Sequence, residues 1–215
     1  MDRTKSIAKD WETHSYYEQV ESQAAINAFW ADWSPFRPLF DTLNLSRTVE
    51  LACGHGRHAA QIAGRCGELV LLDINQTNID YCTERFAGRD NVRVQINDGR
   101  SFEGIADGWA TAIYCYDAMV HFELMDVMGY IHETARALAP GGRALYHHSN
   151  LSRYPGREYH QNPHHRNFMS IAMFRHFAVR AGLKVVASHP ISWGQGADYV
   201  EDIDAMTLLY KMPVE

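Results

Sequence analysis

The sequence predicts a single α/β domain built on a mostly parallel sheet, and three observations lead to this prediction. Short apolar runs alternate with helical patterns, and most runs are separated by the dozen or more residues that a parallel crossover requires. A chain of 215 residues is long enough for one domain to bury its own core. Hydrophobic residues make up 46% of the chain, which argues against extended disorder.

Seven segments have the length and apolar content of buried strands, and four others have the spacing of amphipathic helices. The strands are expected at 48–52, 68–74, 92–96, 110–116, 142–148, 183–188 and 205–211. The helices are expected at 56–65, 76–87, 122–138 and 168–181, and Pro140-Gly141-Gly142 should end the third. Because no long helix separates the last two strands, we expect them to pair antiparallel. The aromatic-rich segment 1–44 is expected to fold as a helical cap.

The charge balance and the absence of long apolar runs limit the partners. With 20 basic and 26 acidic residues the formal net charge is −6, so the chain has no broad basic field for a nucleic acid. The first 20 residues are polar, and no run approaches the roughly 20 apolar residues of a membrane span. Four cysteines occur without a Cys-x-x-Cys pair, which favours reduced thiols. We therefore expect a cytoplasmic protein, a monomer or homodimer, with a small-molecule substrate and neither nucleic-acid nor membrane partners.

The strongest local motif follows the first predicted strand. Gly54 and Gly56 come directly after this strand, which ends at Ala52, and they open a helix. Glycines allow a tight turn, and the free N–H groups at the start of a helix favour an anionic ligand. A Gly-x-Gly pair alone fits an ordinary strand-to-helix turn equally well.

Acidic residues after the next two strands favour a nucleoside ligand. Asp73 closes the second strand, where a carboxylate accepts both hydroxyls of a ribose. Asp98 follows the third strand, where it is placed to bind an adenine amino group while the adjacent backbone reads the ring edge. An NAD-type site is the competing interpretation, but its third glycine is replaced by Ala59, and Asp98 would have no role there. Since the carboxyl ends of parallel strands meet at one edge, these residues should converge.

This ordered set resembles the class I S-adenosylmethionine-dependent methyltransferases of the small-molecule type, from about residue 45 to the C-terminus. The glycine motif is similar to residues 50–56, and the fourth-strand motif to residues 112–122. Leu138-Ala139-Pro140-Gly141-Gly142 is similar to the turn before the fifth strand of the family. The resemblance implies a Rossmann-like, doubly wound sheet of seven strands with the last antiparallel, a cap at 1–44 and a methyltransferase domain at 45–215.

The resemblance also implies the cofactor S-adenosylmethionine (SAM), with S-adenosylhomocysteine (SAH) as product. Gly54 and Gly56 would lie under the methionine moiety, and Tyr116 beside it. Ala52 stands where the family more often has glycine, which is tolerable if its φ is negative. Tyr17 and Trp11 are expected to close over the cofactor, from their location alone. The cofactor-binding residues predicted in this way are Tyr17, Glu50, Ala52, Cys53, Gly54, Gly56, Asp73, Ile74, Asn97, Asp98, Gly99 and Tyr116.

Histidines supply the candidate catalytic groups. His121 follows the fourth strand, where a base with a pKa near neutrality would face the acceptor, although a structural histidine is an equal alternative. His147 and His148 end the fifth strand and should point to opposite faces, so at most one reaches the substrate. Segment 151–167 is a long polar loop that we interpret as a substrate lid. We predict no bound metal, because Pro163 disrupts the helix that would bring His160 and His164 together.

The expected reaction is methyl transfer from SAM to an oxygen or nitrogen of a small polar metabolite, sugar or natural-product intermediate. A cofactor-binding sensor or non-catalytic partner subunit is the alternative from a different class. RNA methylation fits less well with the net charge of −6.

Overall fold

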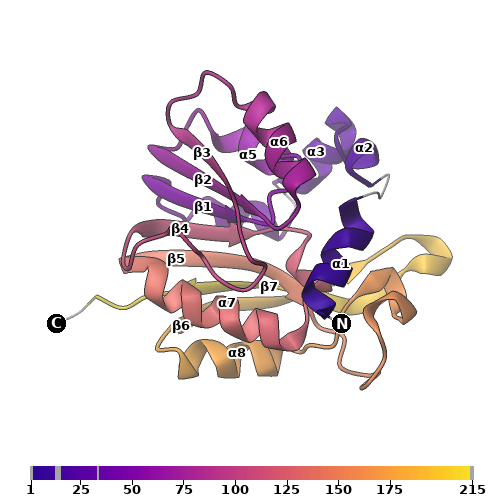
Figure 1. Ribbon diagram of the computed structural model, residues 1–215. Helices are drawn as coiled ribbons and strands as arrows, with labels where there is room; N and C mark the ends of the chain where they lie inside the picture. The colour runs from indigo at the N-terminus through magenta and orange to yellow at the C-terminus, as the bar shows by residue number, and fades with distance from the viewer. Residues whose placement is uncertain (1, 13–15, 33, 214–215) are drawn as a thin grey trace.

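The computed structural model describes residues 2–12, 16–32 and 34–213, which form an N-terminal set of helices followed by alternating strands and helices (Figure 1). The helices are α1 (Arg3–Glu12), α2 (Tyr16–Val20), α3 (Gln23–Trp30), α4 (Phe36–Phe40), α5 (Arg57–Ile62), α6 (Gln76–Arg85), α7 (Leu124–Ala137) and α8 (Ile171–Arg180). The strands are β1 (Arg47–Leu51), β2 (Glu68–Asp73), β3 (Val92–Ile96), β4 (Ala110–Cys115), β5 (Leu138–Ser149), β6 (Lys184–Trp193) and β7 (Val200–Tyr210).

The seven strands form one sheet in the order β3-β2-β1-β4-β5-β7-β6. Strands β1 to β5 pair in parallel, and β7 lies between β5 and β6 and is antiparallel to both. The predicted α/β sheet, including the antiparallel pairing of its last strands, is confirmed. The strand order reverses between β1 and β4, and the loops that follow these two strands diverge there to leave a crevice.

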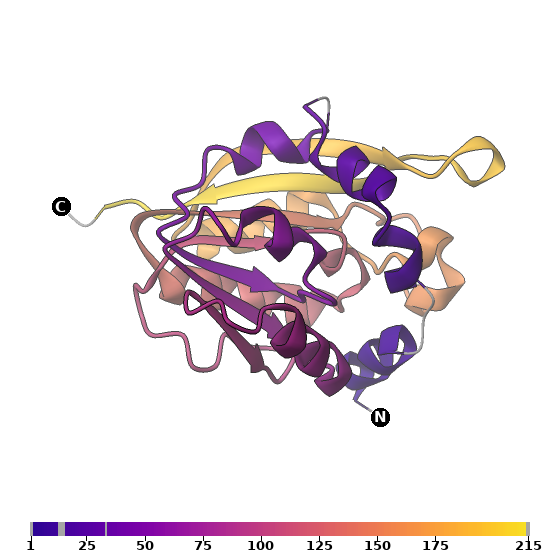
Figure 2. The same ribbon diagram turned by 90° about the horizontal axis from the view of Figure 1, so that it is seen from above.

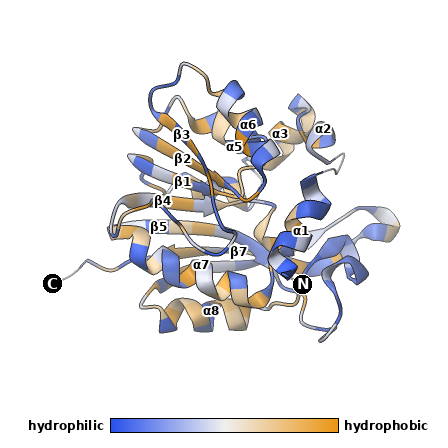
Figure 3. Cartoon of the chain, viewed as in Figure 1, coloured by the Kyte–Doolittle hydropathy of each residue, from blue (hydrophilic) through white to orange (hydrophobic). Residues whose placement is uncertain are grey.

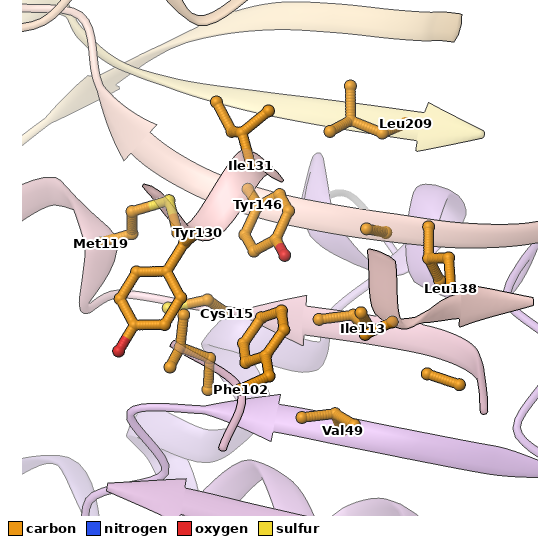
Figure 4. Close-up of a cluster of buried hydrophobic side chains, with 14 of the residues drawn as sticks. Val49, Phe102, Ile113, Cys115, Met119, Tyr130, Ile131, Leu138, Tyr146 and Leu209 are labelled. Atoms are coloured by element: carbon orange, nitrogen blue, oxygen red, sulfur yellow. The ribbon is translucent and has the colours of Figure 1, made fainter. Parts of the chain in front are cut away.

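Both faces of the sheet are buried, because successive side chains of a strand point to opposite sides. In β2, Val70 and Leu72 pack toward α7 and α8, whereas Leu69 and Leu71 pack toward α3 to α6. Figure 4 shows part of the first cluster, in which Phe102, Tyr130 and Tyr146 contribute the large rings. The strands are accordingly apolar along their length, and hydrophilic residues gather on the outer helices and loops (Figure 3).

Two boundaries differ from the sequence prediction for identifiable reasons. Helix α7 ends at Ala137, three residues before Pro140, since the residue that precedes a proline is disfavoured in a helix. Strand β5 then begins at once and carries the Pro-Gly-Gly segment through a register shift against β4. Strands β6 and β7 are longer than predicted, and their hairpin projects beyond the sheet at the end where α1 lies, as two views show (Figures 1 and 2).

The N-terminal helices α1 to α4 match the predicted helical character of segment 1–44. Of these, α1 is tied to several other elements. Its Thr4 hydroxyl donates to Asp126 of α7 at 2.6 Å, and its Ala8 carbonyl accepts from the Asn75 side chain at 2.8 Å. Among the described residues, no helix combines the length and apolar character needed to cross a membrane.

Candidate active site

A pocket of about 980 Å³, including its solvent-open part, lies at the carboxyl ends of the parallel strands. This volume suits a ligand of cofactor size. Residues after β1, β2, β3 and β4 line the pocket, and α1 and α2 complete its wall. The lining residues that the sequence predicted are Tyr17, Ala52, Cys53, Gly54, Asp73, Ile74, Asn97, Gly99, Tyr116 and His121. The predicted convergence of the strand ends is therefore present.

The loop between β1 and α5 needs both of its glycines. Gly54 and Gly56 have φ values of +53° and +73°, in the left-handed region that side chains disfavour. A Cβ atom on Gly54 would lie 2.6 Å from Tyr17, and one on Gly56 would lie 2.7 Å from Phe86. Gly54 thus borders the pocket beneath Tyr17, while Gly56 packs against α6 and its flank and does not line the pocket.

Asp73 organises the loop from the end of β2. Its carboxylate accepts the backbone N–H groups of Gly54 and Asn75, both at 2.9 Å, and the side-chain amide of Asn78 at 3.1 Å. A carboxylate offers about four lone-pair sites, so capacity remains for a ligand hydroxyl. Burial raises the pKa of Asp73, which these hydrogen bonds oppose.

The loop after β3 contributes differently from the prediction. Asn97 and Gly99 line the pocket with Ile74, and the Asn97 amide donates to the Tyr130 hydroxyl at 2.9 Å. Asp98 is exposed and does not line the pocket. Its carboxylate accepts the backbone N–H groups of Arg100 and Ser101 at 2.8 Å each, so Asp98 caps its own turn.

Aromatic rings form the wall opposite the strand ends. The Trp11 ring of α1 lies 4.4 Å, centroid to centroid, from the ring of His121. Tyr17 stacks on His55 at 4.3 Å, and His55 stacks on Tyr81 at 4.0 Å. Both Trp11 and Tyr17 border the pocket, at the place where the sequence suggested a closing segment.

Residues 49–142, which contain this loop and run from within β1 to the first part of β5, match the family model of a methyltransferase domain. This segment of the chain is a methyltransferase domain. A search of curated proteins returns no match.

Solved structures resemble this chain over most of its length. A protein from Pyrococcus horikoshii OT3 is 18% identical with a TM-score of 0.69, covering 94% of this chain and 98% of that one. The geranyl diphosphate C-methyltransferase from Streptomyces coelicolor A3(2), solved with Mg²⁺, geranyl diphosphate and SAH, is 13% identical with a TM-score of 0.71, covering 99% and 98%. The YcgJ protein from Bacillus subtilis is 16% identical with a TM-score of 0.63, covering 83% and 97%. At these identities the likeness concerns the fold.

The pocket of this methyltransferase fits SAM, the cofactor of the family. Asp73 offers a carboxylate for a ribose, and Ile74 and Gly99 offer an apolar slot beside it. At the other end of the loop, the buried Nη1 of Arg57 has no hydrogen-bond partner among the described residues. A ligand with a nucleoside group near Asp73 and a hydrogen-bond acceptor near Arg57 would bond to the Asp73 carboxylate and to the unpaired Arg57 nitrogen.

Ala52 does not have the negative φ that would make an alanine tolerable at this position, because its φ is +55°. A side chain in this region costs roughly 1 kcal/mol relative to glycine. The variant Ala52→Gly is therefore expected to raise the free energy of unfolding by about 1 kcal/mol, as measured by urea denaturation. The control is Ala60→Gly in the exposed part of α5, which should lower it by about 0.5–1 kcal/mol. If both variants lose stability equally, Ala52 carries no strain.

Glu50 lies beneath the loop rather than in the pocket. It is buried and accepts a hydrogen bond from the Tyr114 hydroxyl at 2.6 Å. Burial raises the pKa of Glu50 to about 8. This pKa exceeds the ordinary value of 4.5, so folding favours the protonated form of Glu50. The contribution of Glu50 to the free energy of unfolding is therefore complete below about pH 4.5 and is lost as the pH rises toward 8.

Glu50→Gln keeps an acceptor for Tyr114 and removes the ionisation. We expect it to raise the free energy of unfolding by about 2 kcal/mol at pH 8 and to change it little at pH 5. Urea denaturation at both pH values checks this, with Glu68→Gln at the exposed start of β2 as the control. An equal increase in the free energy of unfolding at both pH values would contradict a raised pKa for Glu50.

Of the three histidines predicted as catalytic, only His121 borders the pocket. Its Nδ1 lies 2.7 Å from the His165 carbonyl oxygen. Since a carbonyl only accepts, Nδ1 carries the proton and Nε2 carries the lone pair. Burial lowers the pKa of His121 to about 3, not the near-neutral value expected, so the ring is uncharged at neutral pH.

His147 and His148 point to opposite faces of β5, as predicted, but both are fully buried outside the pocket. His148 stacks on Phe174 at 3.9 Å and contacts the Thr207 hydroxyl at 2.9 Å. His147 accepts the backbone N–H of Asp117 through Nδ1 at 3.1 Å, and its Nε2 lies 3.2 Å from Asp204.

Segment 151–167 does not line the pocket, although we expected a lid there. It supports the outside of the wall instead: the Tyr159 hydroxyl donates to Asp10 of α1 at 2.5 Å, and Arg166 binds Asp204. Within the described ranges, no group of three or more metal-ligating side chains gathers there or elsewhere.

Sequence reasoning missed several charged residues of the pocket, among them a pair that is buried together. Arg57 is the first residue of α5, and Asp117 follows β4; their side chains form a buried ion pair at 2.9 Å. Arg57 directly follows the motif glycine Gly56, at a position that should be buried. A charged residue at such a position was the signal that could have marked Arg57 as part of the site.

Proposed function

We propose that this methyltransferase transfers the methyl group of SAM to an oxygen or nitrogen of a small polar acceptor. The observation that carries the proposal is that one pocket holds Asp73 and Ile74, which were predicted to bind a nucleoside, together with an uncharged imidazole. Asp73 lies at one wall, and His121 lies beyond Tyr116 at the end of β4. SAM supplies a sulfonium-activated methyl group when it is bound.

The protein would contribute mainly alignment and exclusion of water. Holding an acceptor in line with a methyl group replaces a bimolecular encounter, an effect worth several kcal/mol. In this proposal Trp11 and Tyr17 shield the reacting atoms, and the lone pair on His121 Nε2 accepts a hydrogen bond from the acceptor's O–H or N–H. With its lowered pKa, His121 would orient the acceptor and take its proton only as the new bond forms.

Other features favour a small acceptor. The pocket is bounded by α1, α2 and the strand ends, and its lining is dominated by apolar and aromatic residues. The net charge of −6 disfavours a nucleic acid. We further propose that α1 and α2, rather than segment 151–167, form the lid over the acceptor.

The test is SAH release by the purified chain with SAM and pooled metabolites bearing hydroxyl, amine or acidic carbon nucleophiles. We expect turnover with hydroxyl or amine acceptors. His121→Ala should lower the rate about 10- to 100-fold with SAH affinity nearly unchanged, whereas the exposed His132→Ala on α7 should have no effect. A wild-type rate for His121→Ala would remove its role. SAH binding without turnover of any acceptor would instead favour the sensor interpretation.

A further inference from the structure

Two consecutive residues of segment 151–167 have a strained backbone. His164 and His165 have φ values of +50° and +55°, in the left-handed region that residues with side chains disfavour. Strain of this kind persists only where the surrounding structure holds it, and it clusters at functional sites. The contacts of this turn therefore bear on the function of the segment, which does not itself line the pocket.

Polar side chains hold the turn in its strained conformation. The buried Asn162 bridges the turn, because its side-chain amide donates to the Arg166 carbonyl at 2.9 Å. Arg166 Nη1 donates to the His164 carbonyl at 2.9 Å, while Nε and Nη2 of the same guanidinium are bonded to the buried Asp204. The Nε2 atom of His164 lies 2.7 Å from the Asp198 carbonyl oxygen in the β6–β7 hairpin. The turn is thus fixed from within and from two strands of the sheet.

The turn presents a backbone carbonyl to the histidine of the pocket. The His165 carbonyl oxygen lies 2.7 Å from His121 Nδ1. The contact continues at Asn167, whose backbone N–H donates to the Val120 carbonyl at 2.9 Å. The Asn167 side-chain amide also donates to the His121 carbonyl at 3.3 Å and to Glu123 at 3.1 Å. The end of the segment therefore holds both the ring of His121 and the backbone around it.

The bond to Nδ1 decides what His121 can offer a ligand. A carbonyl oxygen only accepts hydrogen bonds, so it favours the tautomer with the proton on Nδ1 and the lone pair on Nε2. In the opposite tautomer Nε2 carries the proton and donates instead. A histidine that must accept a hydrogen bond from an acceptor substrate through Nε2 depends on the first tautomer.

We propose that the turn 162–166 is a positioning element that fixes His121 in its Nδ1–H tautomer through the His165 carbonyl. This rests on the proposed function, in which the Nε2 lone pair of His121 orients the acceptor. The strained φ angles bring the carbonyl to the ring, because relaxing them would rotate the peptide group that carries it. Asn162 and His164 act through His121, since neither of them lines the pocket.

The tautomer can be measured without turnover. Nitrogen-15 NMR distinguishes a protonated from an unprotonated imidazole nitrogen, and the spectrum of His121→Ala identifies the His121 signals among those of the twelve histidines. We expect the wild type at pH 7 to have His121 protonated at Nδ1 and unprotonated at Nε2. A wild type protonated at Nε2 instead would overturn the proposal.

Asn162→Ala removes the bridge across the turn. We expect it to convert a large part of His121 to the Nε2–H tautomer and to lower the rate of SAH release about 10-fold, with the KM for SAM within about threefold. His164→Ala removes the bond to the Asp198 carbonyl and should shift the tautomer in the same direction by a smaller amount. It provides a second measurement if Asn162→Ala fails to fold.

The control is Asn91→Ala, a matched loss of a bridging amide. The Asn91 side chain donates to the carbonyls of Ala63 and Cys66 at 2.9 and 3.0 Å, and it does not line the pocket. This variant should change neither the His121 tautomer nor the rate of SAH release, even if it lowers the free energy of unfolding. Equal effects of Asn91→Ala and Asn162→Ala on the tautomer would overturn the role of the turn.

The outcomes separate this proposal from the proposed function. If the folded variants Asn162→Ala and His164→Ala both keep the wild-type tautomer, the turn does not fix the ring and this inference alone is overturned. If the tautomer shifts as expected but His121→Ala retains the wild-type rate, the proposed role of His121 is overturned, whereas the effect of the turn on its ring is supported. A shift of the tautomer with a matching loss of rate supports both.

Discussion

Asp204→Asn is expected to lower the free energy of unfolding by about 3–5 kcal/mol at pH 7. Asp204 is fully buried on β7, where its carboxylate accepts from Arg166 Nη2 at 2.6 Å and Nε at 2.9 Å and faces His147 Nε2. Removing its charge leaves the Arg166 guanidinium buried without a counter-ion. Urea denaturation monitored by circular dichroism measures the loss.

The control for this variant is Asp202→Asn, two residues earlier on β7. Asp202 is exposed and has a φ of +51°, which asparagine tolerates. The free energy of unfolding of this variant should therefore differ from that of the wild type by less than about 0.5 kcal/mol. Although burial opposes it, the bonds from His147 and Arg166 hold the pKa of Asp204 below its ordinary value of 3.8. Its stabilising contribution is therefore present above that pH and lost in stronger acid. Equal stability of Asp204→Asn and wild type at pH 7 would contradict the role of the pair.

Asp73→Asn is expected to weaken SAH binding about 100-fold. The carboxylate has room to accept a ribose hydroxyl, and a hydrogen bond to a charged group is worth about 1.5–3 kcal/mol. The asparagine amide retains one oxygen for the surrounding N–H groups, so the fold should persist. Calorimetry measures the binding of SAH and of 5′-methylthioadenosine, which lacks the amino-acid group of SAH. The affinity for both ligands should fall, because both carry the ribose.

The exposed Asp80→Asn on α6 is the control for charge, since it changes the net charge equally and lies outside the pocket. It should leave both affinities unchanged. Loss of SAH affinity with methylthioadenosine unaffected would place Asp73 at the wrong end of the cofactor. Unchanged affinity for both would remove it from the site.

The parts of the site that the sequence predicted depend on local pattern. Glycines with forced backbone angles follow β1, and an acid ends β2; because parallel strands align their carboxyl ends, their convergence follows from the order of elements. The opposite orientation of His147 and His148 follows from the period of a strand in the same way.

What could not be predicted depends on contacts between distant residues or on competition for a side chain. Arg57 and Asp117 are 60 positions apart, and their pairing requires β1 and β4 to be neighbours with a particular loop geometry. Asp98 has the expected position in the chain, but the N–H groups of its own turn bind its carboxylate. The low pKa of His121 arises from burial beneath α1, which no local pattern indicates.

The attachment of α1 has a consequence for the rate at which ligands exchange. Helix α1 forms one wall of the pocket, and two solvent-exposed ion pairs help to fasten it, Arg100 with Asp2 at 2.6 Å and Arg3 with Glu158 at 2.9 Å. Dissolved salt screens exposed pairs of this kind far more than buried ones. Higher ionic strength should therefore loosen α1 and increase the rate at which the product dissociates. The buried contacts around Asp73 should keep their strength.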